Sequence, residues 1–298
     1  NVIGTVLFTA IIWIFREPIV NFLVSLFPGS DPMSLQMRVS IFHVIFNVTT
    51  TCLLLPFVKQ LVQYSCWVIK DRKQEGTTHS LKYVDDRLLS LPPVALMQVK
   101  KEINYMLSLV EENIRYSLAS IDGSPAVNAE KISENEDIID FTNGNLTQFL
   151  IKLSACVDER DEQKIGAYFH VLNDLERIGD HAENFHEIGQ EMLGKELAFS
   201  DTALSDIKQM YGVAIAMIAI AKDAFDTESP DRLPALTDLE NQTDEMKRTF
   251  SAKHFSRLSE GHCSLEVSPY YTSTITGLER VADHLVNVGY SILSPTGS

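Results

Sequence analysis

Two stretches, Leu175-Glu-Arg-Ile-Gly-Asp-His181 and Leu278-Glu-Arg-Val-Ala-Asp-His284, decide the fold, because they share five of seven residues at a separation of 103. Further matches extend outward from them at a separation of about 104. The matched pairs are Glu102 with Asp206, Met106 with Met210, Glu136 with Glu240, and Asp140 with Asp244. Agreement over this length indicates that the chain contains one structural unit twice.

Each copy of the unit predicts three helices. Apolar residues recur at helical spacing in runs of about 25 residues, no alternating strand pattern is present, and prolines fall between the runs. The predicted helices span residues 93–120, 128–155, 161–193, 199–226, 231–259 and 266–293. Since only helices are predicted, an all-α fold is expected. Because short connections make neighbouring helices antiparallel, the fold would consist of tandem antiparallel three-helix bundles at 93–195 and 196–298, after a linker at 71–92.

Pairs of acidic residues four positions apart recur in both copies. This spacing places two carboxylates on one helix face, where they repel each other. Glu136 even falls within the apolar stripe of its helix. If the second and third helices of a bundle pack together, four carboxylates converge, and a multivalent cation would offset the cost of burying them. The candidate metal ligands are Glu136, Asp140, Glu176, Asp180, Glu240, Asp244, Glu279 and Asp283.

The kind of metal follows from the donor type. Carboxylate oxygens suit iron, Mn²⁺ or Mg²⁺, and the four cysteines form no CxxC or CxxxC pair that would bind zinc. The simpler alternative is that these acids are solvated on the surface, with Arg177 and Arg280 pairing some of them. The recurrence of four pairs in register across the repeat favours the cation site.

Residues 1–70 differ from the rest of the chain in composition. They carry two more basic than acidic residues, a net charge of +2. Because the whole chain has a net charge of −15, residues 71–298 have a net charge of −17. Apolar runs at 2–27 and 39–69, interrupted at Pro18 and Pro56, predict discontinuous membrane helices that end a larger membrane domain. Buried helices of a soluble protein are the alternative. Lys70, Arg72 and Lys73 place residues 71–298 in the cytoplasm by the positive-inside rule.

This N-terminal region resembles bacterial sodium/phosphate cotransporters. The segment HVIFNVTTTCLLLPF at 43–57 is similar to their HxxFN…LPF motif, the passage at 1–5 to an earlier motif, and VDDRLLSLP at 84–92 to the linker after their membrane domain. The resemblance implies inorganic phosphate as substrate and Na⁺ as coupling ion. The passages at 1–5 and 46–51 share the pattern Asn, Val, two variable positions and Thr. They supply the candidate substrate or ion contacts Asn1, Thr5, Asn47 and Thr50.

The repeated helical region resembles PhoU proteins, which regulate phosphate uptake. LERIGDHA at 175–182 is close to their signature, and LERVADH at 278–284 is a looser version. The resemblance implies PhoU-like bundles with metal bound at E(D)xxxD motifs, and it carries over to the eight carboxylates named above. Gly277 stands where the first copy has Asp174, so the second site is expected to differ. His181 and His284 are expected to have structural roles.

The leading interpretation is therefore a multi-pass protein of the inner cell membrane. It would perform sodium-driven phosphate symport and carry a cytoplasmic, metal-binding PhoU-like regulatory domain. The alternative is a PhoU-like phosphate-signalling adaptor associated with the membrane. A di-metal enzyme is not expected, because the residue three after Glu176 is Gly179 and the residue three after Glu279 is Ala282, where such sites carry histidine. The partners would include membrane lipid, and a homo-oligomer is compatible with the sequence. The acidic charge argues against nucleic acid.

Overall fold

The computed structural model describes residues 13, 16–29, 31–57, 79–123, 129–261 and 263–291. The chain divides into two units, residues 1–77 and residues 78–298. The described part of the first unit contains helix α2 (Pro32–Leu54), which continues into a 3-10 turn, η1 (Leu55–Phe57). Asp31 caps α2 by accepting a hydrogen bond from the Ser34 amide at 3.1 Å, and Pro32 occupies the first turn. The predicted break at Pro56 thus coincides with the end of a helix.

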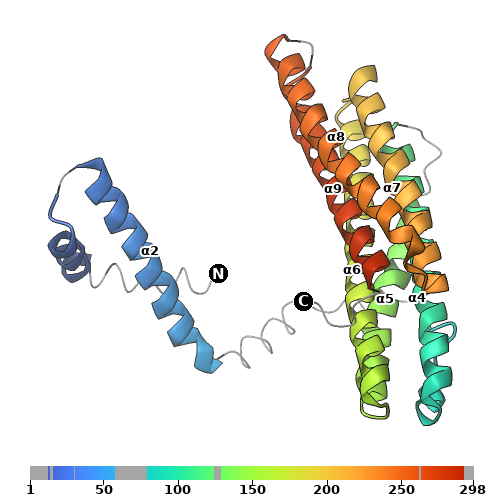
Figure 1. Ribbon diagram of the computed structural model, residues 1–298. Coiled ribbons are helices and arrows are strands. Elements are labelled where there is room, and N and C mark those ends of the chain that lie inside the picture. The colour runs from blue at the N-terminus through green and yellow to red at the C-terminus, as the bar shows by residue number, and fades with distance from the viewer. Residues whose placement is uncertain are drawn as a thin grey trace. The chain divides into compact units, whose positions relative to one another are not determined.

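Six long helices make up the second unit (Figure 1). Their bounds fall within three residues of those expected from the sequence, and no strand occurs among the described residues. The all-α prediction is therefore confirmed. The helices are α4 (Pro92–Ile121), α5 (Ala129–Ser154), α6 (Glu159–Gly194), α7 (Asp201–Thr227), α8 (Leu233–Ser259) and α9 (Ser268–Tyr290).

Local sequence explains where these helices begin. Asp158 caps α6 by accepting from the Asp161 amide at 3.0 Å, and Ser200 caps α7 by accepting from the Ala203 amide at 3.3 Å. Pro230 opens a short 3-10 turn, η3 (Pro230–Arg232), that leads into α8. These polar caps and prolines satisfy or remove the backbone donors that the first turn of a helix leaves unpaired.

The helices pack in two groups of three, α4–α6 and α7–α9, and the groups meet mainly through α6 and α9. Their apolar stripes form one continuous core. Large fully buried side chains, among them Phe185, Tyr211 and Tyr271, lie at its centre. The Tyr211 hydroxyl forms a hydrogen bond of 3.2 Å with the Ser117 hydroxyl, which joins α7 to α4 and satisfies the polar end of the buried tyrosine. The core therefore runs through both copies of the repeat.

Residues 79–91, called the strap below, lie in the region that sequence analysis assigned to a linker, yet they pack on the helical body. Val84 is buried, and a 3-10 turn, η2 (Asp86–Ser90), leads into α4. The Glu102 carboxylate on α4 is only 1% exposed and accepts hydrogen bonds from the backbone amides of Lys82 (3.1 Å) and Tyr83 (2.6 Å). A buried carboxylate requires such donors, so the strap completes the first bundle.

Among the described residues, one helix, α7, is long and apolar enough to cross a membrane. Its apolar face packs in the core of the helical body. Much of the predicted membrane region, namely residues 1–12, 14–15, 30 and 58–78, lies outside the described residues. The discontinuous membrane helices therefore stay a prediction.

Candidate functional site

The first acidic cluster lies where α5 packs against α6. Glu136 of α5 is 6% exposed, and its Oε1 atom has no hydrogen-bond partner. Its Oε2 atom accepts a long hydrogen bond of 3.4 Å from Asn113. A Cβ atom at Gly179 would lie 2.9 Å from Oε2, so glycine allows the α6 backbone to approach this carboxyl group. The structure therefore holds an acid in a dry and incompletely satisfied position.

The acids around Glu136 raise the pKa of one another. Burial raises the pKa of Glu136 to about 8, and repulsion from Asp140, Glu183 and Asp180 adds to the effect. Burial, followed by repulsion from Asp180, also raises the pKa of Asp140 and of Glu176. Glu136, Asp140 and Glu176 are thus each repelled by the charge of Asp180, and a nearby positive charge would relieve this repulsion.

Sequence reasoning missed Glu183, which lies three residues after Asp180 on the same face of α6. Burial raises its pKa, and repulsion from Glu187, Asp140 and Asp180 contributes as well. The helical spacing of Glu176, Asp180 and Glu183 was a usable signal. It escaped notice because the second copy has Val286 at the corresponding position, so the repeat does not mark it.

Positive charge near the first cluster is limited. Arg177 lies 3.8 Å from Glu176 and 3.6 Å from Asp180, and its own side chain is 56% exposed. Exposed ion pairs of this length contribute little, since solvent screens them. Glu136 therefore has no cationic partner among the described residues.

The second acidic cluster lies between α8 and α9, and a lysine inside it offsets part of its negative charge. Burial raises the pKa of Glu240, with repulsion from Asp244, Asp283 and Glu279. However, the Lys247 ammonium lies 2.9 Å from Glu279, whose side chain is only 14% exposed. The first copy has Asn143 at the position of Lys247, so it lacks this cation. The two clusters differ, as expected from the sequence, but through Lys247 and not through Gly277.

All eight acids offer the oxygen donors that a multivalent cation prefers, but the two clusters differ in how much of their negative charge is already offset. Among the described residues, no three His, Cys, Asp or Glu side chains stand close enough together to hold a metal ion as they lie. In the first cluster, the unpartnered Glu136 oxygen and the mutual repulsion suit a bound cation. In the second, Lys247 already supplies positive charge. The fit is therefore better in the first copy.

The position of Asp174 explains why it takes no part in the first cluster. Its carboxylate accepts a hydrogen bond from Nδ1 of His284 at 2.8 Å and a longer one from Asn287 at 3.4 Å, both from α9. The ring of His181 stacks on Phe185 and lies 6.2 Å from the ring of His284. Both histidines thus belong to the contact between α6 and α9.

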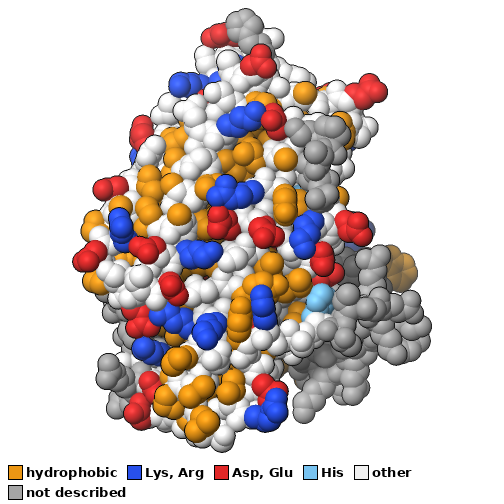
Figure 2. Space-filling view, turned by 90° about the vertical axis from the view of Figure 1, so that its right-hand side faces the viewer, with side chains coloured by type: hydrophobic (Ala, Val, Ile, Leu, Met, Phe, Trp, Pro, Cys, Tyr) orange, Lys and Arg blue, Asp and Glu red, His pale blue; other side chains and the backbone are white. Residues whose placement is uncertain are grey.

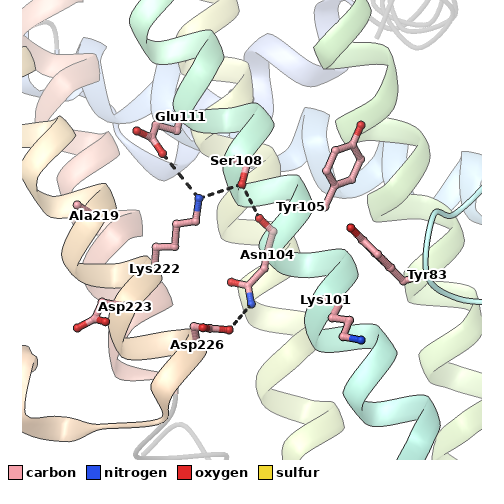
Figure 3. A pocket seen from close by; sticks show the side chains of 10 residues that line it. All are labelled: Tyr83, Lys101, Asn104, Tyr105, Ser108, Glu111, Ala219, Lys222, Asp223 and Asp226. Carbon is pink, nitrogen blue, oxygen red and sulfur yellow. Dashed lines mark hydrogen bonds and ion pairs between the residues drawn. The ribbon is translucent and has the colours of Figure 1, made fainter.

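A surface groove of about 760 Å³ between α4 and α7 shares no residue with either acidic cluster (Figure 3). Its polar side chains mostly pair with one another. Lys222 donates to the Ser108 hydroxyl at 2.9 Å and lies 3.9 Å from Glu111, while the Asn104 amide donates to Asp226 at 2.9 Å. This internal pairing leaves little to attract a ligand.

Charge on the rest of the surface is mixed. On the face in Figure 2, acidic and basic side chains are interspersed among apolar ones. Ion pairs such as Lys100 with Glu228 at 2.8 Å and Lys208 with Asp122 at 3.0 Å join different helices. The first acidic cluster is thus distinguished by Glu136, which is buried and lacks such a partner, although Asp140 and Asp180 beside it are exposed.

The candidate contacts for phosphate or sodium belong to the first unit, residues 1–77. Asn47 is exposed on α2. Asn1 and Thr5 lie outside the described residues, as does the side chain of Thr50. These four residues therefore stay predictions.

A comparison with protein families matches the PhoU domain to residues 103–188 and 207–292, one match for each group of helices. Among curated proteins, a phosphate-specific transport system accessory protein, PhoU homolog 1 of Thermotoga maritima, is 28% identical over 195 residues, which are 65% of this chain and 83% of that protein. YjbB of Escherichia coli, named as a proposed inorganic phosphate export protein, is 22% identical over 260 residues, 85% of this chain. YjbB of Salmonella typhimurium is 22% identical over 98% of this chain.

Solved structures show the same fold. PhoU from Pseudomonas aeruginosa superposes with a TM-score of 0.62 at 19% identity and covers 66% of this chain and 95% of that one. The phosphate transport system regulatory protein PhoU from Streptococcus pneumoniae gives a TM-score of 0.60 at 20% identity over 68% of this chain and 95% of its own. The chain spans about half the length of the YjbB proteins, 47% and 54%.

Proposed function

The chain belongs to the PhoU domain family, and on that premise we propose that it is an accessory or regulatory protein of phosphate transport. The observation that carries the proposal is the family match, which covers both groups of helices. The PhoU homologues among its relatives are named as accessory and regulatory proteins of phosphate transport systems. This function corresponds to the second interpretation of the sequence, the phosphate-signalling adaptor, more closely than to the sodium symporter.

The first acidic cluster supplies the regulatory input in this proposal. A multivalent cation bound there would be held by Glu136, Asp140, Glu176 and Asp180, with Glu183 beside them, and it would neutralise carboxylates that now repel one another. Because Glu136 belongs to α5 while Glu176 and Asp180 belong to α6, neutralisation favours a closer packing of these two helices. The helices themselves supply the rigid frame that orients the acids.

A second candidate function is phosphate movement across a membrane by a part of the protein attached to this regulator. The YjbB matches favour it, since they cover 85% and 98% of the chain and therefore extend beyond the PhoU-domain region into the N-terminal third. YjbB is named for export, whereas the sequence resemblance implied sodium-coupled uptake. The direction of transport and its coupling ion stay predictions.

A flux experiment separates the two functions. Bacterial cells that express the full chain would be supplied with labelled phosphate, and uptake and efflux would be measured against cells with equal amounts of the Asp140→Asn/Asp180→Asn variant. A regulator changes the flux of the host's own transporters, and the variant loses the effect. The chain reconstituted alone into liposomes moves phosphate only if the second candidate is right. Unchanged flux in cells and in liposomes would refute both.

A metal titration tests the cation site directly. Chelator-treated chain would be titrated with Mn²⁺ in a calorimeter, and bound metal would be counted by elemental analysis. Tight binding is expected at the first cluster, with loss in Asp140→Asn/Asp180→Asn. The Lys247→Met variant removes the internal cation of the second cluster, so it is expected to bind additional metal there. Equal binding by wild type and by the double variant would contradict the assignment.

A further inference from the structure

The contact between α6 and α9 is formed by matching parts of the repeat, yet its two sides are not equivalent. On one side, Asp174 of α6 accepts hydrogen bonds from His284 and Asn287 of α9. On the other side, the corresponding donors are His181 and Asn184 of α6, but α9 has Gly277 where the acid would be. One copy therefore holds a complete acid–donor set, and the other has the donors alone.

A groove of about 840 Å³ opens on the incomplete side, and His181, Asn184 and Gly277 line it. The size of the α9 side chains accounts for this space. Three positions along the α6 face correspond to smaller residues on α9: Phe169 to Thr272, His170 to Ser273, and Asp174 to Gly277. All three α9 residues line the groove, so the groove lies at positions where the first copy has larger side chains.

The packing around Gly277 shows why α9 carries no acid there. A Cβ atom at this position would lie 2.6 Å from the Phe185 ring, which is fully buried. In the other copy, the residue at the position matching Phe185 is the smaller Val288. The same Cβ position lies 3.7 Å from Nδ1 of His181. The imidazole therefore faces the place where an acid would sit.

The donors on this side are free to bind a ligand. Within the described part of the chain, His181 makes ring contacts with Phe185 and His284 and no hydrogen bond. Thr276 and Arg280 also line the groove, and the exposed Arg280 guanidinium makes only long ion pairs, 3.7 Å to Glu279 and 3.9 Å to Asp283. The carboxylate of Asp180 lies there too, but Arg177 at 3.6 Å offsets part of its charge.

We propose that this groove binds a small free oxyanion, a carboxylate or a phosphate. His181 and Asn184 would donate to it as His284 and Asn287 donate to Asp174, and the Thr276 hydroxyl and the Arg280 guanidinium would bind its remaining oxygens. The anion thus comes from solution and takes the place of the side-chain carboxylate that Phe185 excludes from position 277.

Nuclear magnetic resonance of the histidine rings tests the proposal. Full chain labelled at histidine and treated with chelator would be titrated with inorganic phosphate and, in a second arm, with acetate, at constant pH and ionic strength. The signals of His181 and His284 are assigned from the His181→Gln and His284→Gln variants. The His181 signals are expected to shift saturably, while those of His284 stay in place because Asp174 already occupies its Nδ1. Saturation by phosphate alone identifies phosphate, and saturation by both ligands identifies oxyanions in general.

Matched variants link any binding to the groove. Asn184→Ala alters an exposed side chain and is expected to weaken binding about tenfold, the effect of losing one hydrogen bond to a charged group. Asn287→Ala, its counterpart in the complete set, is expected to leave the dissociation constant unchanged. The proposal is overturned if neither anion saturates the His181 signals, or if Asn184→Ala binds as tightly as the wild type.

Discussion

The pH dependence of stability should carry the signature of Glu136, because its pKa is raised from 4.5 to about 8 in the folded protein. The folded state then holds the proton more tightly than the unfolded state. The wild type is most stable, as far as this group is concerned, below about pH 4.5, and it loses stability as the pH rises through 8. At 1.36 kcal/mol per pKa unit, the loss amounts to about 5 kcal/mol at most. The side chain is 6% exposed, so solvent screening reduces this figure little.

The measurement is urea unfolding of the full chain, followed by circular dichroism at pH values from 5 to 9 in the presence of a chelator. The variant is Glu136→Gln, which keeps the shape of the side chain but cannot ionise. The difference in unfolding free energy, variant minus wild type, is expected to rise by several kcal/mol between pH 5 and 8 and to level off above pH 8. Taking the difference removes the contributions of titrating groups that do not interact with Glu136. Saturating Mn²⁺ should flatten the wild-type curve, because a bound cation favours the ionised carboxylate.

The matched control is Glu240→Gln, the corresponding change in the second copy. Glu240 is more exposed than Glu136, so its difference curve is expected to rise less. A difference that stays constant with pH for Glu136→Gln would refute the reasoning, since it would mean that the carboxyl group ionises as easily inside the protein as in water. Equal slopes for the two variants would likewise show that burial of Glu136 is not the cause.

Other substitutions test the packing. Gly189→Ala should cost about 1–3 kcal/mol in urea unfolding, because the new Cβ would lie 2.5 Å from the Ser120 backbone. Gly212→Ala, in the middle of α7 with no atom within 4 Å of the new Cβ, should instead add about 0.5–1 kcal/mol, and a loss at this site would contradict that account. Glu102→Ala should cost about 3 kcal/mol and speed hydrogen exchange at the Tyr83 amide; protection equal to wild type would show that the strap does not depend on this carboxylate.

The helices were predictable because their signals are local. Prolines, caps and apolar periodicity mark each helix end, and the repeat supplied the same information twice. The burial of Glu136 could also be predicted, since it falls within the apolar stripe of its helix. Such features depend on residues close together in the sequence, so one chain is enough to find them.

Features that depend on contacts between distant residues could not be predicted in this way. The pairing of Lys247 with Glu279 requires the register of α8 against α9, and the docking of the strap on Glu102 requires its path along α4. The comparison of Asp174 with Gly277 led us to expect a different second metal site, which stays a prediction. Its meaning appeared only when His284 was found across the contact between α6 and α9.

The two hydrogen bonds from the strap to Glu102 fix how the chain enters α4. Glu102 lies ten residues into α4, about 15 Å from the start of the helix. The chain ahead of α4 therefore doubles back along the flank of that helix and joins the body at its side. Residue 92 cannot serve as a pivot without leaving a dry carboxylate unpaired. The strap and α4 therefore keep a fixed arrangement as parts of one helical body.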